Sequence, residues 1–139
     1  MAEGMENRIT LITLGVADLA RSIRFYEDGL KLPRHAFNSD TIAFFRLQAN
    51  QMLALFPIDA LADDTCQPRA ADDRAFRGIT LAHNVGSREE ADAILEEARA
   101  AGARILKPGQ EPPWGGWSGY FADPDNHVWE VAWQPNLPF

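Results

Sequence analysis

The sequence is poor in cysteine, in basic residues and in long apolar runs, and each shortage argues against a class of protein. Cys66 is the only cysteine among 139 residues, so the chain can form no intramolecular disulfide and no CxxC metal site. Its loop-like neighbours include no histidine that would activate a thiolate, so we expect an inert thiol. No apolar run approaches the roughly 18 residues that a membrane-spanning helix needs.

The balance of charge is acidic. Lysine and arginine together number 13 against 20 aspartates and glutamates, which gives a formal charge of −7. Binding to nucleic-acid phosphates or to an anionic membrane depends on clustered basic residues, and here they are scattered. We therefore expect neither nucleic acid nor membrane as a partner, and a ligand that is neutral or cationic.

What the sequence does contain fits one globular domain over residues 1–139. Hydrophobic residues make up 46% of the chain and charged residues 24%, which is typical of a protein with a packed core. The first residues, MAEGMENR, carry acids in place of the basic start and apolar run of a secretory signal. We therefore expect a cytoplasmic protein.

The first half of the chain has the pattern of a strand, a helix and three further strands. The run ITLITLGV at 9–16 is apolar and β-branched, as in a buried strand. Asp18 can cap a helix, and apolar residues then recur at helical spacing until Gly29, which suits a helix end. Shorter strands are expected at 34–37, 41–48 and 51–56, which gives a βαβββ module over about residues 7–57.

The second half repeats this plan over about residues 78–135. An apolar strand at 78–85 precedes Ser87 and Glu90, which form the S-x-x-E pattern of a capped helix. Strands are expected at 103–106, 118–121 and 127–133, and the last two are joined by a tight turn at 123–126. Residues 58–77 between the modules are polar and without a clear period, so we predict a surface linker there.

Two stretches carry a resemblance to a known family. The stretch TLGVADLARSIRFYEDGL resembles the first strand and helix of the vicinal oxygen chelate superfamily, and GYFADPDNHVWEV resembles its final hairpin. That superfamily includes glyoxalase I, extradiol dioxygenases, fosfomycin-resistance enzymes and bleomycin-resistance proteins. The resemblance implies an α+β fold in which two βαβββ modules form an open, curled, barrel-like sheet around a concave cavity. It also implies helices on the outside and a homodimer.

Members of the superfamily with metal chemistry take one ligand from the first strand and one from the last strand of each module, which makes four ligands. By resemblance these positions fall on Leu11, Ala54, Thr80 and Glu130. Only Glu130 is a good donor, because divalent ions of this kind need imidazole nitrogens or carboxylate oxygens. We therefore expect no metal ligand set and no cofactor.

Glu130 stands in an otherwise apolar strand, and a carboxylate there needs a partner. Strand alternation places it with Val128 and Ala132, on the face opposite the larger residues of the strand. An arginine such as Arg46, or water, could satisfy it. Alternatively, Glu130 accepts a hydrogen bond from a ligand or acts as a general base. The same alternation turns His83 and His127 away from the carried-over ligand positions.

Residues at the matching alternate positions of the other strands are expected to line the same cavity. This candidate cavity is mostly apolar with a few polar side chains, which suits a small organic molecule. Trp114 and Trp117 flank a glycine pair and could stack on a ligand at the cavity mouth, although core or dimer packing explains them equally well. The candidate cavity residues are Leu11, Thr13, Met52, Ala54, Thr80, Ala82, Asn84, Trp114, Trp117 and Glu130.

These observations leave three functional hypotheses. The first is a glyoxalase-like protein without a metal that binds a small, partly apolar molecule. The alternative is a metal-dependent lyase or isomerase, or a dioxygenase, of the glyoxalase I type, in which Ni, Zn, Mn or Fe polarises substrate oxygens and a carboxylate moves a proton. The third is a domain kept only for a protein–protein surface.

Overall fold

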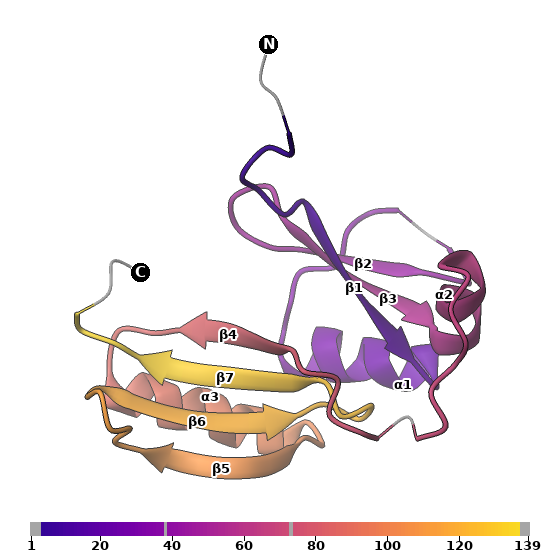
Figure 1. The fold of residues 1–139 in the computed structure, drawn as a ribbon. Helices are drawn as coiled ribbons and strands as arrows, with labels where there is room; N and C mark the ends of the chain where they lie inside the picture. The colour runs from indigo at the N-terminus through magenta and orange to yellow at the C-terminus, as the bar shows by residue number, and fades with distance from the viewer. Residues whose placement is uncertain (1–3, 38, 73, 137–139) are drawn as a thin grey trace.

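The computed structural model describes residues 4–37, 39–72 and 74–136, and it confirms the α+β class with two mixed β-sheets that do not close into a barrel (Figure 1). The first half contains β1 (Leu11–Val16), α1 (Leu19–Ile23), the π-helix η1 (Arg24–Gly29), β2 (Ala43–Arg46), β3 (Met52–Pro57) and α2 (Ile58–Asp64). The second half contains β4 (Thr80–Asn84), α3 (Arg88–Ala100), β5 (Arg104–Gln110), β6 (Trp117–Ala122) and β7 (Val128–Trp133). Among the described residues, no helix is both long enough and apolar enough to cross a membrane.

The second sheet repeats the topology of the first and adds one outer strand, β5. The first has the order β1-β3-β2, and the second has the order β4-β7-β6-β5. In each sheet the opening strand runs parallel to the closing strand, β1 with β3 and β4 with β7, and the remaining pairs are antiparallel. The opening strands β1 and β4 are therefore edge strands of their sheets.

The two predicted helices begin at the caps that the sequence indicates. The carboxylate of Asp18 accepts a hydrogen bond from the Arg21 amide at 3.1 Å, and Ser87 Oγ accepts one from the Glu90 amide at 3.1 Å. The Glu90 carboxylate in turn accepts from the Gly86 amide at 2.6 Å. After Ile23 the first helix widens into η1, in which the Leu30 amide donates to the Phe25 carbonyl five residues earlier.

The prediction of a strand at 34–37 was wrong, because this segment forms only an isolated bridge between Arg34 and Phe45. Its local chemistry explains the failure. The Phe37 amide donates to His35 Nδ1 at 3.0 Å, a bond within the segment that replaces a bond to a neighbouring strand. The chain therefore leaves the sheet one or two residues after Pro33.

The predicted linker between the modules opens with the helix α2, which the sequence pattern did not indicate. Two of its apolar residues, Ile58 and Leu61, lie where a side chain on Gly15 of β1 would be. Gly15 thus gives α2 a place against the first sheet, on the face that the other helices do not cover. The helix has seven residues, none of them fully buried, so its sequence carries too short an apolar period to be recognised.

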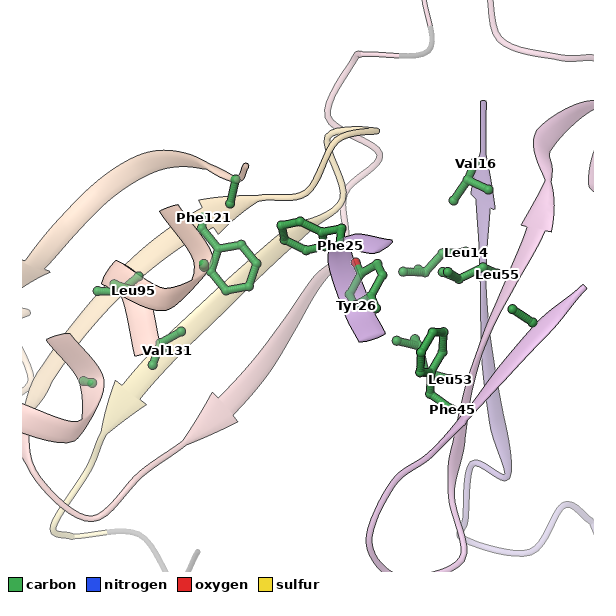
Figure 2. Close-up of a cluster of buried hydrophobic side chains, with 14 residues drawn as sticks. Leu14, Val16, Phe25, Tyr26, Phe45, Leu53, Leu55, Leu95, Phe121 and Val131 are labelled. Atoms are coloured by element: carbon green, nitrogen blue, oxygen red, sulfur yellow. The ribbon is translucent and has the colours of Figure 1, made fainter. Parts of the chain in front are cut away.

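One hydrophobic core joins the two halves. In Figure 2 the rings of Phe25 and Tyr26 from η1 lie between side chains of the first sheet, such as Leu14 and Leu55, and Phe121 of the second sheet. Leu95 and Val131 continue this cluster between α3 and the second sheet. Each sheet turns one face to this shared core and the other face away from it.

Candidate functional site

Glu130 lies on the face of the second sheet that points away from α3 and the core. The register places Ala82 of β4 on one side of it and Tyr120 of β6 on the other. The other residues of this face on β4, β6 and β7 have small or medium side chains; they are Thr80, Asn84, Ser118, Ala122, Val128 and Ala132. Smaller side chains therefore surround one carboxylate and one phenol on this face, and we call this area the Glu130 recess.

The partner of Glu130 is Tyr120, whose hydroxyl donates to Glu130 Oε2 at 3.1 Å. Burial raises the pKa of the Tyr120 phenol, and the hydrogen bond to Glu130 and the charge of its carboxylate raise it further. The phenol therefore stays protonated and donates at neutral pH. Arg46, the partner that sequence reasoning suggested, belongs to β2 of the other sheet and forms no ion pair with any residue that the structure describes.

The first-sheet residues of the predicted cavity lie together, but on their own sheet. Leu11 pairs with Met52 and Thr13 pairs with Ala54 in the parallel ladder of β1 and β3. Leu11 is 41% exposed, whereas Ala54 is fully buried. The two sheets share no ladder, so a single chain presents these residues and Glu130 on separate surfaces.

The two tryptophans do not join this recess. Trp117 points to the opposite side of β6, where its Nε1 donates to Asp92 of α3 at 2.9 Å and the Arg88 guanidinium lies 5.1 Å from its ring centre. We therefore correct its prediction as a residue of the Glu130 cavity, because its position in β6 differs by an odd number from that of Tyr120. Trp114 lies in the preceding turn and is 67% exposed.

The donor set does not fit a divalent metal. Among the described residues, no three or more histidine, cysteine, aspartate or glutamate side chains come together in a way that could hold an ion. The four positions carried over from the resemblance supply one carboxylate, one hydroxyl and two hydrocarbon side chains. The histidines near these positions do not change this, since His127 Nε2 lies 2.7 Å from the Gly15 carbonyl oxygen and His83 pairs with Val131, on the sheet face opposite Glu130.

A buried polar cluster ties the final hairpin to the start of the first helix. The Asp125 carboxylate accepts from the Ala17 amide at 2.9 Å, from the Ser22 hydroxyl at 3.1 Å and from the Arg21 guanidinium at 3.1 Å. These are the two stretches that carried the family resemblance. Their contact shows that they hold the fold together at a distance from Glu130.

Asp123 forms the second half of this cluster. It accepts from the Tyr26 hydroxyl at 2.6 Å, and that hydroxyl accepts from Trp129 Nε1 at 3.1 Å. Burial raises the pKa of the Asp123 carboxyl, although His127 and the surrounding hydrogen bonds oppose the shift. Burial first, and the Asp123 charge second, raise the pKa of Tyr26 well above that of a free phenol.

A cleft of about 970 Å³ runs along β4, between the two halves of the chain. Of the predicted cavity residues it includes Ala82 and Asn84, while Glu130 is outside its lining. The sequence did not indicate this cleft, because its walls come from several segments that are far apart in the chain and share no hydrophobic pattern.

Comparison with known proteins gives a consistent result. A family model described as "Glyoxalase/Bleomycin resistance protein/Dioxygenase superfamily" matches residues 8–131. A crystal structure of a glyoxalase-related enzyme from Fulvimarina pelagi is 36% identical, covers 96% of this chain and 93% of its own, and superposes with a TM-score of 0.85. A comparison with curated proteins finds no match.

Two further solved structures share the fold. A glyoxalase/bleomycin resistance protein/dioxygenase from Nocardioides is 25% identical, with 98% of this chain and 92% of that chain covered and a TM-score of 0.79. A lactoylglutathione lyase from Agrobacterium tumefaciens is 21% identical, with 96% and 98% covered and a TM-score of 0.68. At that identity the likeness to the lyase concerns the fold alone.

Proposed function

The chain belongs to the Glyoxalase/Bleomycin resistance protein/Dioxygenase superfamily, and from this premise we propose that it binds a small, partly apolar organic molecule without a metal ion. The observation that carries the proposal is the Glu130–Tyr120 pair, at 3.1 Å, on a sheet face of otherwise small side chains. Such a face leaves room for a ligand, and the pair gives the ligand one fixed polar contact.

The chemistry of the pair indicates which ligands it favours. Tyr120 already donates to Oε2, so the carboxylate has accepting capacity left for a donor group of the ligand. An ammonium, amide or hydroxyl group would supply that donor, and the charge of −7 also favours a neutral or cationic molecule over an anion. The apolar part of the ligand would lie over Ala82, Val128 and Ala132.

We expect Glu130→Gln to weaken binding of 2-naphthylmethylammonium, used as a cationic aromatic probe, by about tenfold, because the substitution keeps the shape and removes the charge-assisted bond. Binding of 2-naphthylmethanol, the neutral analogue, should change much less. Isothermal titration calorimetry measures both affinities. The matched control is Glu111→Gln, an exposed glutamate away from the recess.

Two results would count against this proposal. One is an unchanged affinity for the cationic probe in Glu130→Gln. The other is a rise in melting temperature when Ni²⁺, Zn²⁺, Mn²⁺ or Fe²⁺ is added, if Glu130→Gln abolishes that rise, since a ligand that binds only the native state stabilises it.

The second result would favour the alternative function, a metal-dependent lyase, isomerase or dioxygenase. One observation supports that alternative, because the relative from Fulvimarina pelagi at 36% identity is described as an enzyme. In that case Glu130 would move a proton and Tyr120 would hold the carboxylate in place. Turnover of a glutathione hemithioacetal would identify the lyase directly.

We also propose that a second copy of the chain covers the outward faces. Apolar residues at or just before the edge strands β1 and β4 are exposed: Ile9 at 60%, Leu11 at 41% and Ile79 at 67%. A homodimer that brings β1 of one copy to β4 of the other would bury these residues. It would also place the first-sheet cavity residues opposite Glu130.

The dimer proposal predicts that Ile79→Asp shifts the protein from dimer to monomer in sedimentation equilibrium, because the contact would then bury an unpaired charge. The dissociation constant of the dimer should rise at least about tenfold. Phe76→Asp, an equally exposed apolar residue in the linker, is the control and should leave the dimer intact. A wild-type chain that sediments as a monomer would contradict the proposal.

We place the protein in the cytoplasm. Cys66 is a free and exposed thiol. An exposed thiol is stable in a reducing compartment, whereas an oxidising compartment favours disulfides.

A further inference from the structure

We propose that the cleft between the two halves of the chain is a second ligand site, which takes a small monoanion with an aromatic or branched aliphatic body. The site goes beyond the proposed function, because it lies on the core side of the second sheet and excludes Glu130. Its volume of about 970 Å³ is at the upper end of the range for pockets that hold small organic molecules.

The floor of the cleft is a rigid aromatic surface. The rings of Phe121 and Trp129 are nearly parallel, at 6°, with centres 6.2 Å apart. Trp129 is only partly buried, and its Nε1 is held by the Tyr26 hydroxyl at 3.1 Å. Because the indole is fixed in the free protein, a flat ligand could stack on it without the cost of ordering the side chain.

The apolar part of the cleft wall comes from three segments. Leu30 and Leu32 follow η1, Ile94 projects from α3, and Leu47 begins the turn between β2 and β3. Figure 2 shows two of the lining residues, Phe121 and Val131, on the second sheet. These walls favour the hydrocarbon part of a ligand over a fully polar one.

The uncompensated charge in the cleft is positive. Arg46 is one of its lining residues and forms no ion pair with any described residue. The one acidic residue of the lining, Glu97, already lies 3.7 Å from Lys31 Nζ. A carboxylate or sulfonate could therefore take Arg46 as a bidentate partner, with His83 also in the lining. The charge of −7 on the whole chain favours one negative charge on the ligand over several.

The turn that carries this wall is preformed. The Leu47 amide donates to the Gln51 carbonyl at 2.8 Å, and Ala49 and Asn50 both adopt positive φ, 59° and 60°. Two consecutive residues of this kind form the tight hairpin turn that matches the twist of the flanking strands. Arg46 at the end of β2 is thus presented from a defined backbone.

The experiment uses 2-naphthoate and its neutral analogue 2-naphthylmethanol with the full-length protein. We expect 2-naphthoate to bind with a dissociation constant below about 1 mM and to shift the Nε1–H resonance of Trp129 in heteronuclear NMR spectra. Arg46→Gln should weaken 2-naphthoate by about tenfold or more and leave 2-naphthylmethanol nearly unchanged. Arg24→Gln, an exposed arginine outside the cleft, is the matched control.

A second variant fills the space. Ile94→Trp places a larger side chain in the cleft and should abolish 2-naphthoate binding, while 2-naphthylmethylammonium still binds at the Glu130 recess. Circular dichroism confirms that each variant is folded. Glu130→Gln should leave 2-naphthoate binding intact. The proposal of a ligand at the Glu130 recess and the proposal of a ligand in the cleft can therefore fail independently.

Each of the following results would overturn the inference. These are no 2-naphthoate binding up to about 5 mM, equal affinity in the wild type and Arg46→Gln, and resonance shifts confined to the Thr80 and Glu130 face. Equal losses of affinity for 2-naphthoate in Arg24→Gln and Arg46→Gln would likewise overturn it, because they would show a general effect of charge.

Discussion

Asp125→Ala should lower the free energy of unfolding by about 3 kcal/mol, which is about 10 °C in melting temperature for a chain of this size. The substitution removes the acceptor for the Ala17 amide, the Ser22 hydroxyl and the Arg21 guanidinium together. Ser22 is fully buried, so its hydroxyl would lose its partner where water does not replace it. Arg21 is 42% exposed and contributes little, because solvent screens its charge.

Chemical denaturation with matched variants checks this prediction. Asp125→Asn keeps one carbonyl oxygen as an acceptor and should lose less than Asp125→Ala. Asp63→Ala removes an exposed aspartate of α2 and should change stability by less than about 0.5 kcal/mol. A loss in Asp125→Ala no larger than in Asp63→Ala would show that the cluster does not hold the hairpin to the helix.

Gly119→Val should destabilise the protein by about 3 kcal/mol or more and reduce the yield of folded protein. A Cβ at position 119 of β6 would lie 2.8 Å from the Lys107 carbonyl oxygen and 3.1 Å from the Gly109 amide nitrogen, both in the backbone of β5. It would also lie 2.6 Å from a methyl group of Leu95. Backbone cannot move aside as a side chain can, so β5 would have to separate from the sheet.

The local register supports this reason. The ladder between β5 and β6 shifts between Ile105 and Lys107 and again between Lys107 and Gln110. These irregularities bring the backbone of β5 over Gly119. Gly86→Ala is the control, because the added Cβ would meet only the flexible end of the Glu90 side chain. Thermal unfolding that is equal in the two variants would contradict the prediction.

The sequence was a good guide wherever one residue type had one structural role. Asp18 and Ser87 cap helices, and the alternation in β7 turns Glu130 away from Val131, as the pattern predicts. It was a poor guide where a tertiary contact decided the outcome. The helix α2 forms against Gly15, and the segment after Pro33 leaves the sheet because of a bond within the segment.

The candidate site shows the same division. Strand parity indicated the face that Glu130 shares with Thr80 and Ala82, but not its partner Tyr120. The turn at 123–126 does not identify that partner, because counting outward from it pairs position 120 with position 129, whereas the observed register pairs Tyr120 with Glu130. The cleft has no such signal, because Arg46 and Trp129 meet there only after the two halves pack together.

The cluster around Asp125 also orders events during synthesis of the chain. Ala17, Arg21 and Ser22 leave the ribosome more than 100 residues before the carboxylate that they bind. At about 5–20 residues per second, these donors remain without this acceptor for several seconds. We therefore expect a nascent chain that stops before the final hairpin to expose the rings of Phe25 and Tyr26, which makes it a substrate for chaperones until translation ends.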